Sequence, residues 1–144
     1  MNLSRHFTLE EACFSSTAVR RGIDNVPDEE CMNNMVVAAQ GMERVRELLG
    51  YPVHVDSWFR SKALNKAVGG SKNSAHMLGY AVDFVCPDFG TPRQIFEALR
   101  RSEFDFDQII MEGSWVHVSF DPKKRQEALE AHFGPGGATY TRTA

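Results

Sequence analysis

The stretch SAHMLGYAVDF, residues 74–84, places a histidine seven residues before an aspartate, with a glycine between them. Imidazole nitrogens and carboxylate oxygens are common zinc ligands in hydrolases, which usually hold the metal with three protein ligands and leave one position open. The spacing alone leaves two interpretations. His76 and Asp83 are either two members of a metal-ligand set, or a loop histidine paired with a nearby acidic residue.

Local structure decides whether these two side chains can converge. Asp83 lies in a strand-like run over residues 79–85, on the face opposite Val82 and Phe84. His76 has the opposite parity along the chain, so one straight strand cannot present both side chains on the same face. A turn at Gly79 removes this difficulty, because the preceding loop can then fold back over the strand that carries Asp83.

A further histidine stands inside another apolar strand. His117 lies in the middle of WVHVSF, residues 115–120, on the face opposite Val116 and Val118. A polar group at such a position must be paired, coordinated or directed to solvent. The run DQIIME, residues 107–112, comes just before it, and the intervening Gly113-Ser114 is typical of a tight hairpin.

The hairpin predicts the position of a glutamate. If Gly113 and Ser114 form a two-residue loop, Ile110 pairs with His117, and Glu112 becomes the diagonal neighbour of His117, ~7 Å away between backbones. A carboxylate at that distance cannot easily bind the same metal, but it can reach the water molecule that a zinc hydrolase activates. Glu112 is therefore the candidate general base.

Arg60 follows the first strand-like run in SWFRS, residues 57–61. A guanidinium binds a carboxylate through two parallel hydrogen bonds. In a peptidase that acts on short peptides, Arg60 could hold a substrate carboxylate or polarise a carbonyl.

Together, SWFRS, LNKAVGGSKNSAHMLGYAVDF, DQIIME and WVHVSF resemble the zinc D-Ala-D-Ala carboxypeptidase and L-Ala-D-Glu endopeptidase family. The usual pattern of that family is approximately SGYRS, then SxHxxGxAxD, then a final histidine on a strand. The likeness covers about residues 53 to 120, and the opening FTLEEACFSSTAVRRGIDN also looks like the start of compact phage members. These enzymes cut the peptide stems of bacterial peptidoglycan, and many are phage endolysins.

The resemblance implies roles for individual residues. His76, Asp83 and His117 would be the ligands of one zinc ion. Arg60 would orient the substrate, and Ser74 would line the site. The resemblance also implies the metal-site fold that this family shares with the amino-terminal signalling domain of hedgehog proteins.

Two departures from the family pattern bear on the site. Family members often carry an acidic residue or a histidine two or three places before the last ligand, where this chain has Ser114 and Trp115. The base is therefore assigned to Glu112, five places before it. Trp58 replaces the glycine of SGYRS, and we expect it to narrow or reshape the rim beside Arg60.

The surrounding pattern predicts an α+β fold with a small antiparallel sheet flanked by helices, because helices cluster early in the chain and strands late. Capping residues and apolar spacing predict helices over 9–13, 28–49, 61–67 and from 91 onward. Strands are expected within 51–59, 79–85, 107–112 and 115–120. Residues 15–27 are expected to form a loop, and residues after 120 a weak helix and a fraying tail.

Length and composition set the class of protein. The chain has 144 residues, 42% hydrophobic and 24% charged, which suits a single domain over 1–144 with its core at about 28–120 and a tail at 121–144. The net charge of −3 and the lack of a basic run argue against nucleic-acid binding. The three cysteines are widely spaced and form no disulfide framework.

No run approaches the ~18 apolar residues that a membrane span needs, and the N-terminus lacks a signal-peptide core. We therefore expect a monomer with no membrane or nucleic-acid partner. It would be made in the cytoplasm and act on the cell wall after phage lysis or export by another route.

The leading hypothesis is a zinc metallopeptidase that hydrolyses peptidoglycan stem peptides, as a D-Ala-D-Ala carboxypeptidase or an L-Ala-D-Glu-type endopeptidase. The alternatives are a catalytically silent zinc module that binds the wall or a protein partner, and a structural component of a phage. Two histidines and a carboxylate could also serve an Fe(II) oxygenase, but the surrounding sequence favours hydrolysis.

Overall fold

The computed structural model describes residues 1–143, which fold around one six-stranded sheet with the strand order β1-β2-β4-β3-β5-β6. All neighbouring strands are antiparallel except β3 and β5, which are parallel. The α+β prediction is confirmed. The strands are β1 His54–Ser57, β2 Ala81–Val85, β3 Gln108–Met111, β4 Val116–Ser119, β5 Glu127–Gly134 and β6 Gly137–Arg142.

Side-chain caps define where the helices begin. Thr8, Asp28 and Thr91 each accept a hydrogen bond from a backbone N–H of the first helical turn. The helices predicted around these caps are confirmed, as is the short helix after Ser61. The helices are α1 Leu9–Cys13, α2 Ser16–Arg21, α3 Glu29–Leu49, α4 Lys62–Ala67, the short 3-10 helix η1 Ala75–Leu78 and α5 Pro92–Arg101.

The loop predicted over residues 15–27 is partly wrong, because α2 lies within it. Ser15 caps this helix by accepting a hydrogen bond from the backbone N–H of Ala18, and Gly22 ends it in the left-handed conformation. The helix spans less than two turns and buries one residue, Ala18. Its sequence is therefore too short to show the apolar periodicity by which a helix is recognised.

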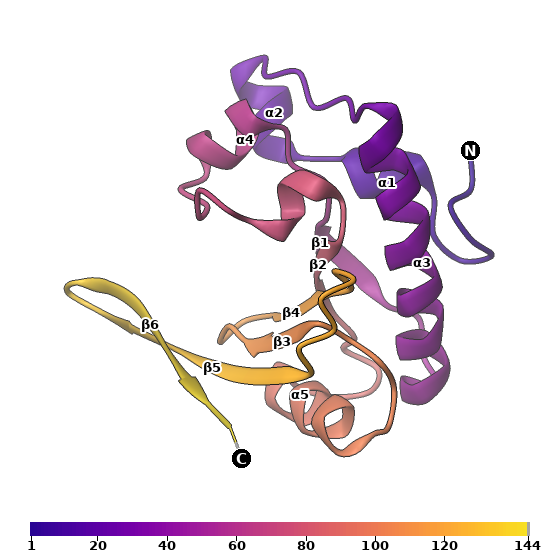
Figure 1. Ribbon diagram of the computed structural model, residues 1–144, viewed down its shortest axis with the longest axis vertical. Helices are drawn as coiled ribbons and strands as arrows, with labels where there is room; N and C mark the ends of the chain where they lie inside the picture. Colours follow the sequence, from indigo (N-terminus) through magenta and orange to yellow (C-terminus); the bar gives the residue numbers. More distant parts are fainter. Residues whose placement is uncertain (144) are drawn as a thin grey trace.

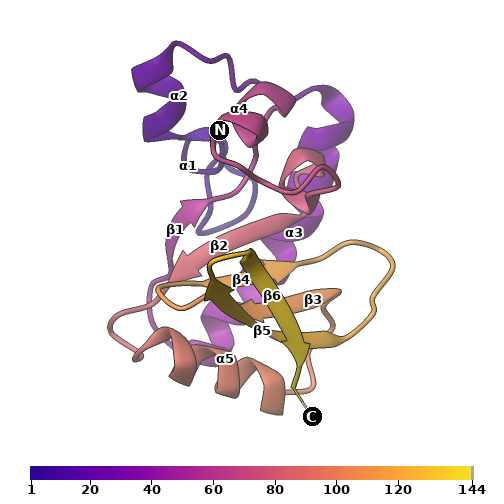
Figure 2. The ribbon, with the colours of Figure 1, turned by 90° about the vertical axis from the view of Figure 1, so that its left-hand side faces the viewer.

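The core lies on one face of the sheet. Val82 and Phe84 of β2 and Val118 of β4 are fully buried there, in one cluster with residues of α3 and α5. Figure 1 shows α5 below the strands and α3 beside them, and in Figure 2 α3 passes behind β2 and β4. The opposite face of β2 and β4 is therefore left for the polar residues. No helix in the described part of the chain is long and apolar enough to cross a membrane.

The C-terminal segment contradicts the prediction of a weak helix and a fraying tail. Residues 127–142 form the hairpin β5–β6, which extends the sheet and projects away from the body (Figure 1). Residues EALEA favour a helix locally, but β5 pairs with β3 over Gln108–Met111, and this tertiary pairing overrides local propensity. The turn at Gly134–Gly137 then returns the chain as β6.

Candidate metal centre

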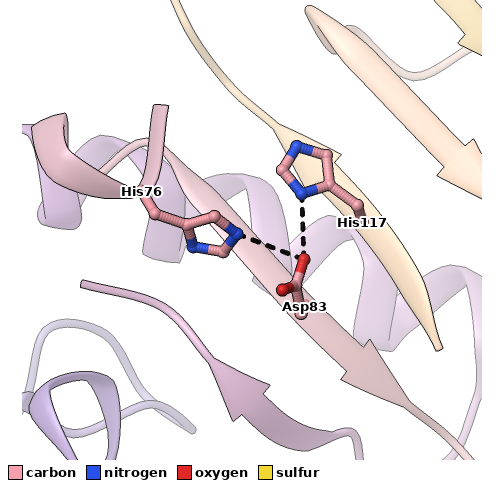
Figure 3. Close-up of side chains that lie close together, drawn as sticks. All are labelled: His76, Asp83 and His117. Atoms are coloured by element: carbon pink, nitrogen blue, oxygen red, sulfur yellow. Dashed lines mark hydrogen bonds and ion pairs between the residues drawn. The ribbon is translucent and has the colours of Figure 1, made fainter. Parts of the chain in front are cut away.

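Two histidines and one aspartate converge on the face of the sheet opposite the core. Asp83 of β2 and His117 of β4 are direct cross-strand partners, and His76 comes from η1. His117 Nδ1 lies 2.9 Å and His76 Nε2 3.2 Å from the same oxygen, Asp83 Oδ1 (Figure 3). One potential ligand atom from each of the three residues lies within 4.8 Å of the others.

Gly79 brings His76 to this point, as expected from parity. It ends η1 with φ +89°, a conformation that favours glycine. A Cβ at this position would lie 2.7 Å from the Cys31 carbonyl oxygen and 2.7 Å from Met35 Cγ in α3. The turn that lets the histidine reach Asp83 is thus also a place where the chain packs closely against α3.

Ser74 caps η1. Its hydroxyl oxygen accepts a hydrogen bond from the backbone N–H of His76 at 3.2 Å. This bond supports the loop that carries the histidine.

The backbone of Trp58 fixes the orientation of the His76 ring. The backbone carbonyl of Trp58 lies 2.6 Å from His76 Nδ1, and a carbonyl can only accept, so Nδ1 carries the proton. The indole N–H donates to the Gly79 carbonyl at 3.0 Å, and the side chain is 1% exposed. The expectation that Trp58 shapes the rim is therefore wrong, because its side chain lies in the core.

The tautomer of His76 suits a metal ligand. With the proton on Nδ1, the lone pair of Nε2 points toward Asp83 and His117, which is the arrangement that metal-binding histidines usually have. Burial lowers the pKa of His76 despite the opposing effect of the Asp83 carboxylate. Burial would raise the pKa of Asp83, but the charges and hydrogen bonds of His76 and His117 hold it well below its ordinary value. Neutral imidazole and ionised carboxylate are the protonation states that bind a cation.

Arg60 lies on the other side of Asp83. Its Nη2 donates to Asp83 Oδ2 at 3.3 Å, and its Nε donates to Ser57 Oγ at 3.2 Å. Nη1 donates to the side-chain oxygen of buried Asn65 at 3.4 Å. The guanidinium therefore orients the carboxylate. The supporting role of Asn65 was not predicted, because no motif in the sequence marks it.

Arg60 also lines a groove of about 210 Å³ beside the cluster. The groove is bounded by the segment that leads into α2, by the end of β1 and by α4. Its lining combines the aromatic ring of Phe14, the carboxylate of Asp56 and the apolar side chain of Val68. A short peptide could therefore meet both the guanidinium and apolar surface there.

Glu112 occupies the position that the hairpin argument predicted. Ile110 pairs with His117, and the backbone N–H of Glu112 donates to the Trp115 carbonyl at 3.1 Å across Gly113-Ser114. Burial and the charge of Asp83 raise the pKa of Glu112, while His117 and Arg60 act in the opposite direction. Its carboxylate is thus coupled to the cluster by charge.

The remaining histidines have other partners among residues 1–143. His6 Nδ1 lies 2.6 Å from Glu43, and His54 lies 3.5 Å from Asp56 on the surface. His132 pairs with Thr141 within the C-terminal hairpin. The donors that could hold one metal ion together are therefore His76, Asp83 and His117.

Comparison with known proteins gave one family. The sequence model of the family described as Peptidase M15 matches residues 5–119. No curated protein matches the chain. The matched range includes the three converging side chains, Arg60 and Glu112, and it ends before β5 begins.

Proposed function

The chain belongs to the peptidase M15 family, and on this basis we propose that it is a zinc-dependent peptidase that hydrolyses peptide bonds in the stem peptides of bacterial peptidoglycan. The observation that carries the proposal is the convergence of His76, Asp83 and His117 within 4.8 Å on the face of the sheet opposite the core. Two imidazoles and one carboxylate are a common ligand set of zinc peptidases, which leave a further position for chemistry.

One zinc ion would be held by His76 Nε2, His117 Nδ1 and the Asp83 carboxylate. When bound, zinc polarises the scissile carbonyl and lowers the pKa of water. The chain orients the ligands themselves. The Trp58 carbonyl fixes the tautomer of His76, and Arg60 holds Asp83 by its second oxygen.

Glu112 acts as the general base and then as the general acid. It takes a proton from the attacking water, and it passes this proton to the nitrogen of the leaving amine as the peptide bond breaks. Its position supports this role, because Glu112 directly follows β3, whose Ile110 pairs with His117, and it is partly buried.

Arg60 and Ser74 are proposed to meet the substrate on the other side. Arg60 lines the groove beside β1 and α4, where a guanidinium can orient a stem-peptide carboxylate. The protein would act as a monomer and reach the wall after phage lysis or export by another route. Either the D-Ala-D-Ala or the L-Ala-D-Glu bond suits this arrangement.

The proposal is tested on purified peptidoglycan. Excess chelator should abolish the release of muropeptides, zinc should restore it, and metal analysis of the active sample should give one zinc per chain. Mass spectrometry of the muropeptides identifies the bond that is cut. Full hydrolysis in excess chelator would contradict the metal mechanism. One bound zinc without any hydrolysis would instead favour a silent zinc module.

A further inference from the structure

The C-terminal hairpin β5–β6 lies beyond the residues that the family model matches, 5–119. It carries two exposed aromatic side chains, Phe133 at 64% and Tyr140 at 50% exposure. The two side chains lie on a strand pair that continues the sheet of the proposed active site, so they can lie on the same face as the metal ligands or on the opposite face.

Strand register assigns each residue to a face, because directly paired residues of neighbouring strands share a face of the sheet. Starting at the metal ligands, the pairs form one continuous row across the sheet. This row contains Asp83, His117, Ile110, Leu129 and Arg142. Residues two positions from Leu129 and Arg142 in β5 and β6 share the same face. The face of the hairpin that carries Ala131, Phe133 and Tyr140 is therefore continuous with the face of the metal ligands.

Side-chain contacts support this assignment. Glu127 accepts hydrogen bonds from Gln108 at 2.6 Å and from Arg142 at 2.7 Å, on the site face. Glu130 has the opposite parity, and it pairs with Arg93 of α5, which covers the other face. The hairpin thus keeps the same two faces as the rest of the sheet.

Tyr140 stands in line with the proposed base. The pairing of β3 with β5 ends at Met111 and Glu130, and the residues that follow them in the chain are Glu112 and Ala131. Ala131 pairs directly with Tyr140. Tyr140 therefore lies two strands, at ~4.8 Å per spacing, from the end of β3 that leads into Glu112. Burial raises the pKa of Tyr140, and the charges of Glu112 and Asp83 add to this effect, so the phenol lies within their electrostatic reach.

Phe133 lies against the tip of the neighbouring hairpin. Its Cε2 lies 3.9 Å from the point where a Cβ on Gly113 would stand. Gly113 directly follows Glu112, so this ring also lies on the Glu112 side of the site. The two aromatic side chains therefore extend the site away from the groove beside Arg60, toward the free edge strand β6.

We propose that the β5–β6 hairpin forms the substrate-binding wall on the Glu112 side of the site, where Tyr140 and Phe133 contact the stem peptide beyond the bond to be cut. This inference rests on the proposed function. Aromatic rings pack against the aliphatic parts of a peptide, and the phenol of Tyr140 can donate to a peptide carbonyl or carboxylate. The peptide then runs across the strands, from the Arg60 groove past the metal ligands to the hairpin.

The test compares four variants on the full-length protein loaded with zinc. Tyr140→Ala and Phe133→Ala remove a ring each, Tyr140→Phe removes only the hydroxyl, and His132→Ala changes the opposite face of the same hairpin. We measure KM and kcat with soluble stem-peptide substrates. We also measure the Kd of the same peptides by calorimetry, with each change placed in a Glu112→Gln protein, which should cleave them far more slowly.

Loss of either ring should raise KM and Kd about tenfold, the size of effect typical of a contact in a binding site, with kcat within about threefold. Tyr140→Phe should lie between Tyr140→Ala and the unaltered protein, and His132→Ala should change neither constant. Zinc content and thermal midpoint should stay unchanged, because both rings are exposed.

Unchanged KM and Kd in both alanine variants, beside an active unaltered protein, would overturn the hairpin proposal alone. Absence of both binding and cleavage by the unaltered protein would overturn the proposed function and this inference together. The competing possibility is that a second copy of the chain binds this face of the hairpin. Sedimentation velocity measures whether the protein forms such a dimer. A dimer that dissociates in Tyr140→Ala while KM stays unchanged would also overturn the proposal.

Discussion

At the scale of single residues, two of the three proposed metal ligands, His76 and Asp83, are oriented by groups that are not themselves ligands. The Trp58 carbonyl fixes the ring of His76, and Arg60 holds the second oxygen of Asp83. Such partners set both the direction and the protonation state of the donor atom. The orienting groups come from the segment after β1, so this segment is as much a part of the site as the ligands.

Glu112→Gln should separate catalysis from metal binding. The amide keeps the size of the side chain but cannot take a proton, so kcat should fall about 10²- to 10⁴-fold while zinc affinity changes little. Turnover of stem peptides and zinc titration by calorimetry check these two effects. Glu103→Gln, at an exposed position outside the site, is the matched control. A Glu112→Gln protein with full activity would assign the base to another residue.

At the scale of secondary-structure elements, capping residues and periodicity predicted α1, α3, α4, α5 and the four strands that carry or flank the site. The short helices α2 and η1 and the hairpin strands β5 and β6 were not predicted. Helix α2 is too short for its periodicity to be read, and β5 owes its conformation to its pairing with β3 rather than to its own sequence. The failure at β5 is tertiary in origin, because local propensity does not contain the pairing with a distant strand.

The candidate site was predictable to a similar extent. The types and spacing of His76, Asp83 and His117 pointed to a metal set through their resemblance to a family, and hairpin register placed Glu112 beside His117. The role of Trp58 in orienting His76 could not be predicted, because the atom that contacts His76 is a backbone carbonyl, which every residue has.

Gly79→Ala should destabilise the protein and weaken zinc binding together. A non-glycine residue at φ +89° costs about 1–2 kcal/mol, and the contacts of a Cβ with Cys31 and Met35 add about 1–3 kcal/mol. Relief of this clash requires movement of η1, which carries His76. Denaturant unfolding and zinc titration check both effects.

Gly50→Ala is the matched control for this substitution. Gly50 also has a positive φ, +76°, but nothing lies within 4 Å of its added Cβ. It should therefore show the backbone cost of about 1–2 kcal/mol without any change in zinc affinity. Equal destabilisation in the two variants, with equal zinc affinity, would refute the close packing of η1 against α3.

The loop between β4 and β5 is fixed by one buried carboxylate. Asp107 is 1% exposed, and it accepts hydrogen bonds from Nε, Nη2 and the backbone N–H of Arg125 at 2.9, 2.8 and 3.1 Å. Arg125→Ala should therefore lower the free energy of unfolding by about 2 kcal/mol at neutral pH. This figure lies in the lower part of the range for bonds to charged groups, because the arginine is half exposed.

The cost of Arg125→Ala should depend on pH. Burial would raise the pKa of Asp107, but its bonds to Arg125 hold that pKa below the ordinary value. A depressed carboxyl pKa contributes stability above the unfolded pKa of about 3.9, and this contribution is lost as the pH falls through the folded pKa. The difference between the two proteins should shrink below about pH 4, as urea unfolding from pH 2 to 7 can check. A difference that stays constant with pH would contradict this account.

At the scale of the whole molecule, the candidate site lies where the helical part of the chain meets the sheet. His76 belongs to η1, which packs against α3, whereas Asp83 and His117 belong to central strands. Figure 1 shows η1 grouped with α1, α2 and α4 above the strands. A metal ion bound by all three residues would therefore tie these two parts of the fold together.

Zinc should accordingly stabilise the fold. A ligand that binds only the folded state adds about 2.7 kcal/mol at a free concentration one hundred times its Kd, which corresponds to roughly 5–10 °C in a domain of this size. Differential scanning calorimetry with and without zinc checks the shift. His117→Ala removes one of the three ligands, so its midpoint should rise far less on addition of zinc. An equal rise of the midpoint in both proteins would mean that the stabilising zinc binds elsewhere. His76 and Asp83 would then be joined to His117 by hydrogen bonding rather than by a shared metal.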